Sequence, residues 1–455
     1  MGRIVIAALA ASLLAAACGD GAVLGSTGTT PPTTSGASST VPSTTPSSTT
    51  EAPVSSATTS TVPPSSTSTT STTTTTTTTT AGTTTMAPAP VTTDPSLPVG
   101  IRGRHLIPWD EVDDDWVLAL YSGDLVVGGY VDGPTVLYLV SPDAEVYEIT
   151  AWSAGSRQPW AIVDWSPDHG RALLRSGPLP PPGNDHRLTQ VDLATGARDD
   201  VVTVPETTWE IDAAYTEPTG RNFVVGTDDG ATEHLEVHRS GGVNAVLVDR
   251  PSVPEGIAWL YGQAGTSVVV SDVDGIRLLD NQGGLIRMLN TPGAECWVPR
   301  WWSPHQVLAA CIPSAEYAAG NWYHQLWLVP DDGSEATELT TVPSGGIVVV
   351  DFGIVDARKA AGETVLQWRG DCSSASIEIL QPDGSGTTIP IDFPVDVGGV
   401  ELIGTQRARL AIRYWDDCGQ TQSWLGQIAI DGTFLGELVP KVADTAGIIS
   451  AVGLP

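Results

Sequence analysis

The stretch Asp164-Trp165-Ser166-Pro167-Asp168-His169-Gly170-Arg171 places a set of turn residues between two short apolar segments. Proline presets φ for a turn, Ser and Asp side chains hydrogen-bond to nearby backbone, and glycine accepts positive φ. The flanking segments, residues 160–165 and 172–175, have the composition of strands. The stretch therefore predicts a β-hairpin.

The same hairpin pattern recurs along the chain at a period of about 45 to 50 residues. Between residues 116 and 440 the chain divides into seven units, each with room for four short strands. The predicted first strands span 116–121, 160–165, 209–215, 256–261, 297–302, 347–352 and 400–404. The predicted third strands span 136–140, 187–192, 234–239, 276–280, 325–329, 376–380 and 425–430. Several third strands lead into Asp-Gly turns, which are strong hairpin signals.

Four-stranded units at this spacing predict an all-β fold, a single β-propeller whose blades pack on one another. Our count is seven blades, and six or eight also fit the spacing. An array of β-sandwiches is the rival architecture, but it would require linkers between domains, and no Ser/Thr-rich break follows residue 98. The ring must also close. Either residues 104–107 add a strand to the last blade, or residues 448–452 join the first.

Two of the hairpins carry a family resemblance. Trp165-Ser166-Pro167-Asp168 and Trp302-Ser303-Pro304 resemble the Trp-Ser-Pro-Asp-Gly hairpin of TolB-like, WD-repeat-like propellers of the bacterial envelope. The chain departs from that pattern where His169 precedes Gly170 and where His305-Gln306 replaces Asp-Gly. The resemblance implies a propeller that binds proteins or peptides across one face or in its channel.

The N-terminus has the features of an export signal. Residues 1–17 contain one early charge, Arg3, an apolar run over residues 4–14, and three alanines directly before Cys18. The apolar run is too short for a stable membrane span. The segment resembles a bacterial lipoprotein signal, which implies lipidation of Cys18 and membrane anchoring outside the cytoplasm. An ordinary cleaved signal peptide with an incidental cysteine is the alternative.

Residues 18–98 are almost wholly Thr, Ser, Pro, Ala and Gly, with nine consecutive threonines at 72–80. Such a composition cannot bury enough apolar surface to offset backbone ordering, so we expect a disordered linker. A flexible coil of this length would span on the order of 50 Å. Both an O-glycosylated stalk and an unmodified tether fit the composition. Residues 99–455 are left for the propeller domain.

The chain is strongly acidic, with a formal net charge of −31. Residues 1–98 contribute −2 of this total, which leaves −29 for residues 99–455. Such a surface repels nucleic acid and anionic lipid headgroups and attracts cations or basic partners. We therefore expect no nucleic-acid partner, and contact with the membrane only through the N-terminal lipid. General solubility is the alternative explanation of the charge.

Four cysteines remain after Cys18, and an even set in an exported protein predicts disulfides. Cys296 and Cys311 flank the turn at residues 303–306 and should lie opposite each other in a hairpin. Cys372 and Cys418 are 46 residues apart, one repeat period, so a bridge there would join loops of neighbouring blades. Zinc binding by the four cysteines is the alternative, although no Cys-x-x-Cys pair is present.

The loops between second and third strands are rich in acidic and aromatic residues. In a propeller they should emerge on the same face as the connections between blades, so we predict that they form a binding rim. The alternative is that Asp occurs there because it favours turns. The candidate residues are Tyr317, Trp322, Tyr323, His324, Asp371, Trp415, Asp416 and Asp417.

Two features raise the question of metal binding. His234, Glu236 and His238 alternate along a predicted strand and project from one side, but no fourth ligand is evident, so a surface strand is the alternative. The acidic run at residues 110–115 suggests Ca²⁺, but it lacks the EF-hand spacing, and a solvated acidic segment is the alternative. We expect no cofactor.

No Gly-x-Ser-x-Gly, Rossmann or phosphate-loop motif is present. We therefore expect a monomeric, non-enzymatic protein that binds or scaffolds an envelope protein, a peptide or a wall polymer. The alternative is a lyase or hydrolase that acts on a polysaccharide or peptide at the channel mouth. Converging acids and histidines in the channel would favour the enzyme, because the fold alone decides neither.

Overall fold

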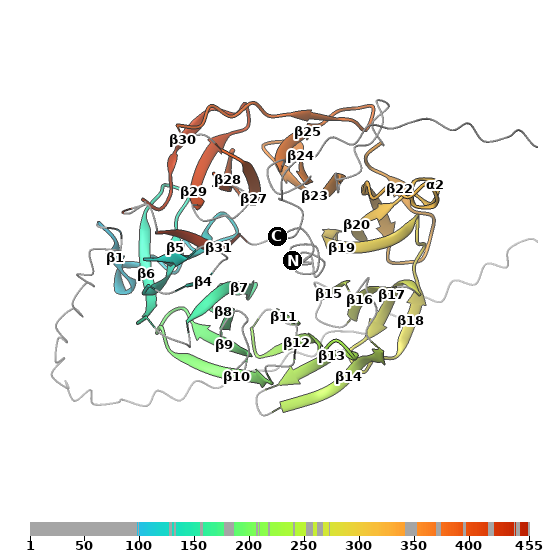
Figure 1. Ribbon diagram of the computed structural model, residues 1–455, viewed down its shortest axis with the longest axis horizontal. Helices are drawn as coiled ribbons and strands as arrows, with labels where there is room; N and C mark the ends of the chain where they lie inside the picture. The colour runs from blue at the N-terminus through green and yellow to red at the C-terminus, as the bar shows by residue number, and fades with distance from the viewer. Residues whose placement is uncertain are drawn as a thin grey trace, which may run out of the picture. The chain divides into compact units, whose positions relative to one another are not determined.

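Seven sheets, each built on four antiparallel strands, form a ring in this computed structural model (Figure 1). Each sheet is one blade, and its strands follow one another from the ring axis outwards. The predicted seven-bladed, all-β propeller is therefore confirmed. The structure describes residues 98, 100–126, 130–131, 133–154, 158–176, 186–205, 208, 210–216, 219–239, 242–251, 258–261, 267–272, 274–341, 353–369, 375–394, 397–416, 423–440, 442 and 446–453.

Blades 2 to 7 each use four consecutive strands, with the first strand innermost. Blade 2 contains β7 (Pro159–Trp165), β8 (Arg171–Ser176), β9 (His186–Asp192) and β10 (Arg198–Val204). Blade 3 contains β11 (Glu210–Tyr215), β12 (Asn222–Asp228), β13 (Thr232–Arg239) and β14 (Gly242–Pro251). Blade 4 contains β15 (Ala258–Tyr261), β16 (Ser267–Asp272), β17 (Gly275–Asp280) and β18 (Leu285–Met288).

The remaining three consecutive blades follow the same order. Blade 5 contains β19 (Ala294–Ser303), β20 (Gln306–Ile312), β21 (Gln325–Pro330) and β22 (Thr337–Glu338). Blade 6 contains β23 (Gly353–Ala360), β24 (Glu363–Arg369), β25 (Ser376–Leu380) and β26 (Gly386–Thr388). Blade 7 contains β27 (Gly399–Gln406), β28 (Arg409–Trp415), β29 (Ser423–Ala429) and β30 (Phe434–Glu437).

Blade 1 closes the ring by combining the two ends of the domain. Its strands, from the axis outwards, are β31 (Gly447–Gly453), β2 (Val117–Ser122), β5 (Thr135–Val140) and β6 (Val146–Trp152). The alternative in which residues 448–452 join the first blade is thus correct. Residues 104–107 add no strand to the last blade: β1 (Arg102–Gly103) pairs in parallel with the outer edge of β6, and η1 (Arg104–Leu106) follows it.

Two of the predicted first strands need correction. Residues 116–121 form the second strand of blade 1, because β31 takes the innermost position. The innermost strand of blade 6 is β23, which begins after the predicted range 347–352; that range lies outside the described residues. The third strand is confirmed in every blade. Residues 125–126 and 130–131 form a separate two-stranded hairpin, β3 (Leu125–Val126) and β4 (Tyr130–Val131).

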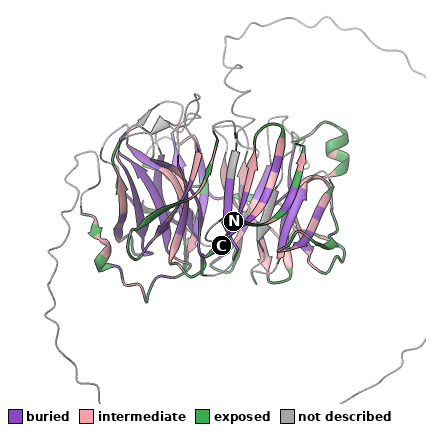
Figure 2. Ribbon diagram, turned by 90° about the horizontal axis from the view of Figure 1, so that it is seen from below, coloured by how far each residue is buried: buried purple, intermediate pink, exposed green. Residues whose placement is uncertain are grey.

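Burial falls from the middle of each blade to its outer edge (Figure 2). All residues of β2 and β5 are buried, whereas all four residues of β18 are exposed. The middle strands are apolar on both faces because a neighbouring blade covers each face. Outermost strands have less cover, which explains why the sequence pattern is weakest there.

The Ser166–Gly170 turn has the predicted chemistry. The Ser166 hydroxyl donates to Asp168 Oδ1 at 2.7 Å and accepts the Arg171 N–H at 2.9 Å, and Asp168 Oδ1 also accepts the Gly170 N–H at 3.0 Å. His169 takes a φ of 60°, and its ring contacts the buried Trp165 edge-on with centroids 5.4 Å apart. The extra residue relative to the family pattern is thus accommodated in the left-handed region, next to the Trp that begins the turn.

A polar contact crosses every seam between neighbouring blades. Most of these contacts join a side chain on one blade to a backbone group on the next. They therefore fix the position of each blade relative to its neighbour. The pairs, in order around the ring, are Ser450–Ile162, Asp164–Tyr215, Arg250–Asp272, Ser271–Cys296, Trp297–Val355, Gln367–Leu402 and Ser423–Ile448. In the described residues, no helix has both the length and the apolar character needed to cross a membrane.

Candidate functional site

The loop between β20 and β21, which we call the α2 loop, carries the two aromatic side chains that are exposed among the residues the structure describes. Because the four strands of a blade alternate in direction, second-to-third-strand loops leave the same face as the connections between blades. We call this the α2 face, after helix α2 (Ser314–Ala318), which is exposed at one end of the ring (Figures 1 and 2). Tyr317 lies in α2 and Trp322 follows it, and they are 44% and 47% exposed.

Tyr317 and Trp322 form an edge-to-face pair, with ring centroids 6.0 Å apart and an interplanar angle of 75°. The loop that carries them is internally hydrogen-bonded: the Asn321 N–H donates to the Glu316 carbonyl at 3.0 Å, and the Asn321 amide donates to Glu316 Oε2 at 2.7 Å. Gly320 takes a φ of 78° at the turn after the helix. The aromatic pair is therefore presented by an ordered loop.

The next two rim candidates, Tyr323 and His324, are buried. The His324 ring stacks on Trp297 of β19 with centroids 3.9 Å apart, and its carbonyl accepts the Ile354 N–H at 3.1 Å. His324 also forms a parallel bridge with Gly353, the first residue of β23. These two side chains thus do not face solvent. They anchor the end of the β20–β21 loop at the seam between blades 5 and 6.

Trp415 is also buried, at the end of β28, where its carbonyl accepts the Gly398 N–H at 2.7 Å. A Cβ at Gly399 would lie 2.6 Å from the Trp415 ring, so the indole packs directly on the backbone of β27. Asp416 follows and is partly exposed. Asp371 and Asp417 lie outside the described residues.

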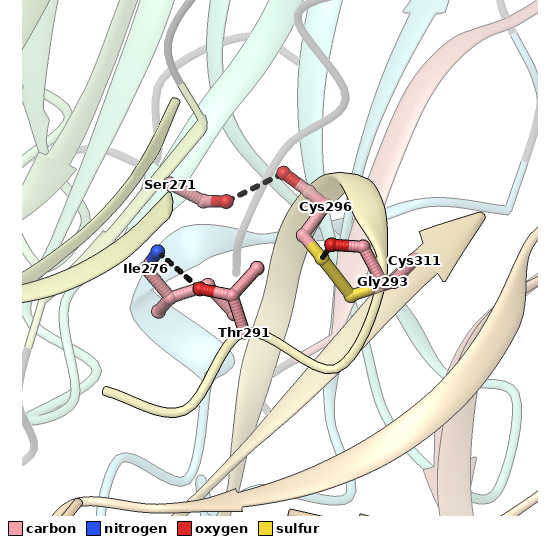
Figure 3. Close-up of a disulfide and its surroundings, with 6 residues drawn as sticks. All are labelled: Ser271, Ile276, Thr291, Gly293, Cys296 and Cys311. Atoms are coloured by element: carbon pink, nitrogen blue, oxygen red, sulfur yellow. Dashed lines mark hydrogen bonds between the residues drawn. A yellow bond between two sulfur atoms is a disulfide. The ribbon is translucent and has the colours of Figure 1, made fainter. Parts of the chain in front are cut away.

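The predicted disulfide between Cys296 and Cys311 is confirmed (Figure 3). The two cysteines are directly paired in the β19–β20 hairpin, with Cα atoms 4.1 Å apart and an S–S distance of 2.03 Å. The Cys296 carbonyl accepts the Ser271 hydroxyl of blade 4 at 2.5 Å. The disulfide therefore secures the blade that carries the α2 loop. Cys18, Cys372 and Cys418 lie outside the described residues.

The candidate metal ligands of β13 have protein partners. His238 Nε2 lies 3.1 Å from Glu236 Oε2, and the His238 ring stacks on Phe223 with centroids 5.7 Å apart. His234 Nδ1 lies 3.5 Å from Asp249 Oδ1. Across the described ranges, no group of three His, Cys, Asp or Glu side chains has the geometry to hold a metal ion, and this includes the acidic run at 110–115.

The inner strands of blades 5 to 7 also carry a charged cluster that the repeat pattern does not predict. Arg300 of β19 donates from Nε to Asp356 Oδ1 at 2.6 Å and from Nη2 to Asp356 Oδ2. Arg358 Nε lies 3.9 Å from Asp356 Oδ2, and Arg413 Nη1 lies 3.6 Å from Glu401 Oε2. The sequence signal is the presence of charged residues within inner strands, but the sequence does not say which blades the partners occupy.

The pKa values in this cluster follow from burial and pairing. Burial raises the pKa of Asp356, whereas Arg300, Arg358 and the Ala357 N–H lower it. Together the three lowering interactions outweigh burial, so the pKa lies below its ordinary value. Burial and the nearby Arg300 lower the pKa of Arg358. A carboxylate held ionised by two guanidinium groups is a poor proton donor or acceptor at neutral pH. The cluster therefore has the character of a structural ion-pair network.

No protein-family model matches the chain, and no curated protein matches its sequence. Among solved structures, the β-propeller domain of the trilobed protease from Pyrococcus furiosus matches 71% of this chain and 99% of its own, at 13% identity and a TM-score of 0.43. TolB from Acinetobacter baumannii matches 74% of this chain and 68% of its own, at 11% identity and a TM-score of 0.39.

An oligogalacturonate lyase solved with manganese matches 66% of this chain and 88% of its own, at 12% identity and a TM-score of 0.41. The chain spans about half, 53%, of an acylaminoacyl peptidase from Pyrococcus horikoshii that it also matches. At these identities and TM-scores, the matches do not distinguish binding from catalysis.

Proposed function

We propose that this chain is a TolB-like, exported binding protein, anchored outside the cytoplasm through a lipid on Cys18. Residues 18–98 would serve as its tether, and the propeller would act as a monomer without a cofactor. Its ligand would be an envelope protein, a peptide or a wall polymer. The observation that carries the proposal is the exposed pair of Tyr317 and Trp322 on an ordered loop.

Aromatic side chains of this kind are frequent anchors of binding interfaces, because they supply a large contact area at little entropic cost. Here the loop is already ordered by the Glu316–Asn321 hydrogen bonds and by the buried His324. Pre-ordering a binding loop raises affinity, because less conformational freedom is lost on association. The arrangement of the inner strands also supports binding over catalysis, since Asp356 and Glu401 both pair with arginines.

The test is affinity capture from a detergent extract of the native envelope by the immobilised full-length protein, because in detergent the lipid on Cys18 cannot itself bring membranes down. We expect the wild type to capture a discrete envelope component. The double substitution Tyr317→Ala/Trp322→Ala should reduce the captured amount at least about tenfold, as loss of two interface anchors would. Leu285→Ala/Ile286→Ala is the matched control, because it removes two exposed apolar side chains from the outer edge of blade 4. Equal capture by the two double variants would overturn the proposal.

A further inference from the structure

Blade 5, which carries the aromatic pair, is almost free of positive charge. The structure describes every residue from Ala294 to Thr341, and within this range Arg300 is the one Lys or Arg. Arg300 is buried and engaged with Asp356 of blade 6, so it adds no positive charge to the surface of the blade. The carboxylates in the same range are Glu295, Glu316, Asp331, Asp332, Glu335 and Glu338.

Three of these carboxylates lie toward the α2 face. Glu316 is in α2 itself, Glu295 is near the start of β19, and Glu338 is at the end of β22. Glu338 also contacts the Gln325 amide, directly after the α2 loop. These positions follow from strand direction, because odd-numbered strands of the blade start at this face and even-numbered strands end there.

Two of the basic side chains near blade 5 approach it from the opposite face, whereas Arg369 of blade 6 ends β24 at the α2 face, where its strand partner Gly353 bridges to His324. Arg287 donates to the Asp332 carbonyl in the β21–β22 turn, and the Lys359 ammonium lies 5.0 Å from the ring centre of Trp302, next to the β19–β20 turn. Both turns leave the face opposite to α2. The described surroundings of Tyr317 and Trp322 within the blade are therefore anionic, in a domain that is already strongly acidic.

The aromatic pair has the electrostatic character that complements a cation. The face of a Tyr or Trp ring is negative, and a Lys or Arg side chain placed over it is attracted within about 6 Å. In an edge-to-face pair, the ring that presents its edge keeps both faces clear of its partner. Glu316 directly precedes Tyr317, and its carboxylate accepts a hydrogen bond from Asn321, which directly precedes Trp322.

We infer that the ligand of the α2 loop is a basic peptide segment whose Lys or Arg side chain lies over Tyr317 or Trp322. This inference rests on the proposed function and names the chemistry of the partner. The negative field of the domain raises the encounter rate with such a segment, and the rings supply the local contact. A neutral glycan would gain nothing from the charge distribution of this blade.

The test is calorimetric titration of the full-length protein with an octa-lysine peptide at low and at physiological salt. General attraction to an acidic protein would also give a signal, so the decisive variant is Tyr317→Ala/Trp322→Ala, which leaves the net charge unchanged. We expect it to weaken binding about tenfold, as loss of cation–π contacts would. Glu316→Gln should weaken binding about threefold, an effect that decreases as salt screens it. Leu285→Ala/Ile286→Ala should bind like the wild type.

Two further probes separate this inference from the proposed function. A fully acetylated octa-lysine peptide keeps the length but loses the charge, and we expect it not to bind. If the aromatic double variant binds octa-lysine as the wild type does, the inference is wrong. If the aromatic double variant binds octa-lysine like the wild type but no longer captures the envelope component, the loop is still the binding site and its ligand is not cationic. Binding of a chito-oligosaccharide that depends on the two aromatics would likewise replace the basic peptide with a glycan.

Discussion

The imidazole of His324 stacks on the indole of Trp297, with ring centroids 3.9 Å apart, and both side chains are buried. This contact fixes the end of the exposed α2 loop to the innermost strand of its own blade. The His324 backbone meanwhile pairs with Gly353 of the next blade. The same contacts therefore order the α2 loop and join blades 5 and 6. Substitutions there should affect both the stability of the domain and the proposed binding.

Gly353→Ala should destabilise the protein more than a substitution at a comparable glycine. Gly353 has a φ of 80°, and an added Cβ would lie 2.5 Å from the His324 carbonyl oxygen. Gly362 in the same blade has a φ of 89° but open space around its Cβ position. We expect Gly362→Ala to cost about 1 kcal/mol from backbone strain and Gly353→Ala roughly 2 kcal/mol more. Urea denaturation measures the loss of unfolding free energy in each variant. Equal losses would show that the backbone shifts to remove the close contact at position 353, and would contradict this prediction.

Ile448→Ala tests closure of the ring by the C-terminal strand. Ile448 is 1% exposed and packs in the core of blades 1 and 7, so its truncation should cost about 3 kcal/mol. The matched control Ile286→Ala truncates a side chain that is 51% exposed and should change stability by no more than about 0.5 kcal/mol. Thermal and urea unfolding compare the two. An equally small effect at Ile448 would mean that β31 does not complete the core.

Removal of the Cys296–Cys311 disulfide should lower the free energy of unfolding by about 3 kcal/mol, because the bridge closes a short loop of the unfolded chain. Cys296→Ala/Cys311→Ala is preferable to reductant, since the chain has other cysteines and Cys311 is fully buried. Alanine avoids placing an unpaired hydroxyl in the core. A change below about 1 kcal/mol by urea denaturation would contradict a stabilising role.

Asp356→Asn should change how stability depends on acid. The net pKa of Asp356 is lowered in the folded state, so its contribution is present above the unfolded pKa of 3.8 and is lost as pH falls through the folded value. We expect the variant to be about 3 kcal/mol less stable at pH 7, where a buried charge pair is broken. The difference from wild type should shrink below pH 3.8.

Urea titrations at pH 7 and at successively lower pH give this difference directly. Glu363→Gln, which alters an exposed carboxylate at the β23–β24 turn of the same blade, is the control and should change little at any pH. A stability difference between wild type and Asp356→Asn that stays constant through the acid range would rule out the ion pair as its source.

The repeat and the hairpins could be predicted because turn chemistry and strand alternation are local. Ser166, Asp168 and Gly170 make the bonds that their residue types suggest, and the register of Cys296 against Cys311 follows from the length of one hairpin. The first strand of blade 1 could not be predicted, because the second strand of that blade begins with the same aromatic signal as the first strands of other blades. Only contact with β31, more than 300 residues away, decides its place.

The proposed binding loop could be predicted from the sequence, but its exposed side chains could not. Trp322 and Tyr323 are neighbours of similar character, yet one is exposed and the other buried. The difference arises because Gly353 of the next blade pairs with His324 and covers this end of the loop. The ion pair of Arg300 with Asp356 could not be predicted either, because it joins the inner strands of two blades that are far apart in the sequence.

The most direct measurement of the central claim, that the α2 loop is the binding site, is site-specific photo-cross-linking in the native cells. A photoreactive p-benzoylphenylalanine would replace Ala318, which is exposed in α2 next to Tyr317, or Val243, which is also exposed, on the outer strand of blade 3. We expect a discrete adduct from position 318 that disappears in the Tyr317→Ala/Trp322→Ala background, and none from position 243. Equal adducts from both positions, or an adduct at 318 that persists without the two aromatics, would contradict the claim.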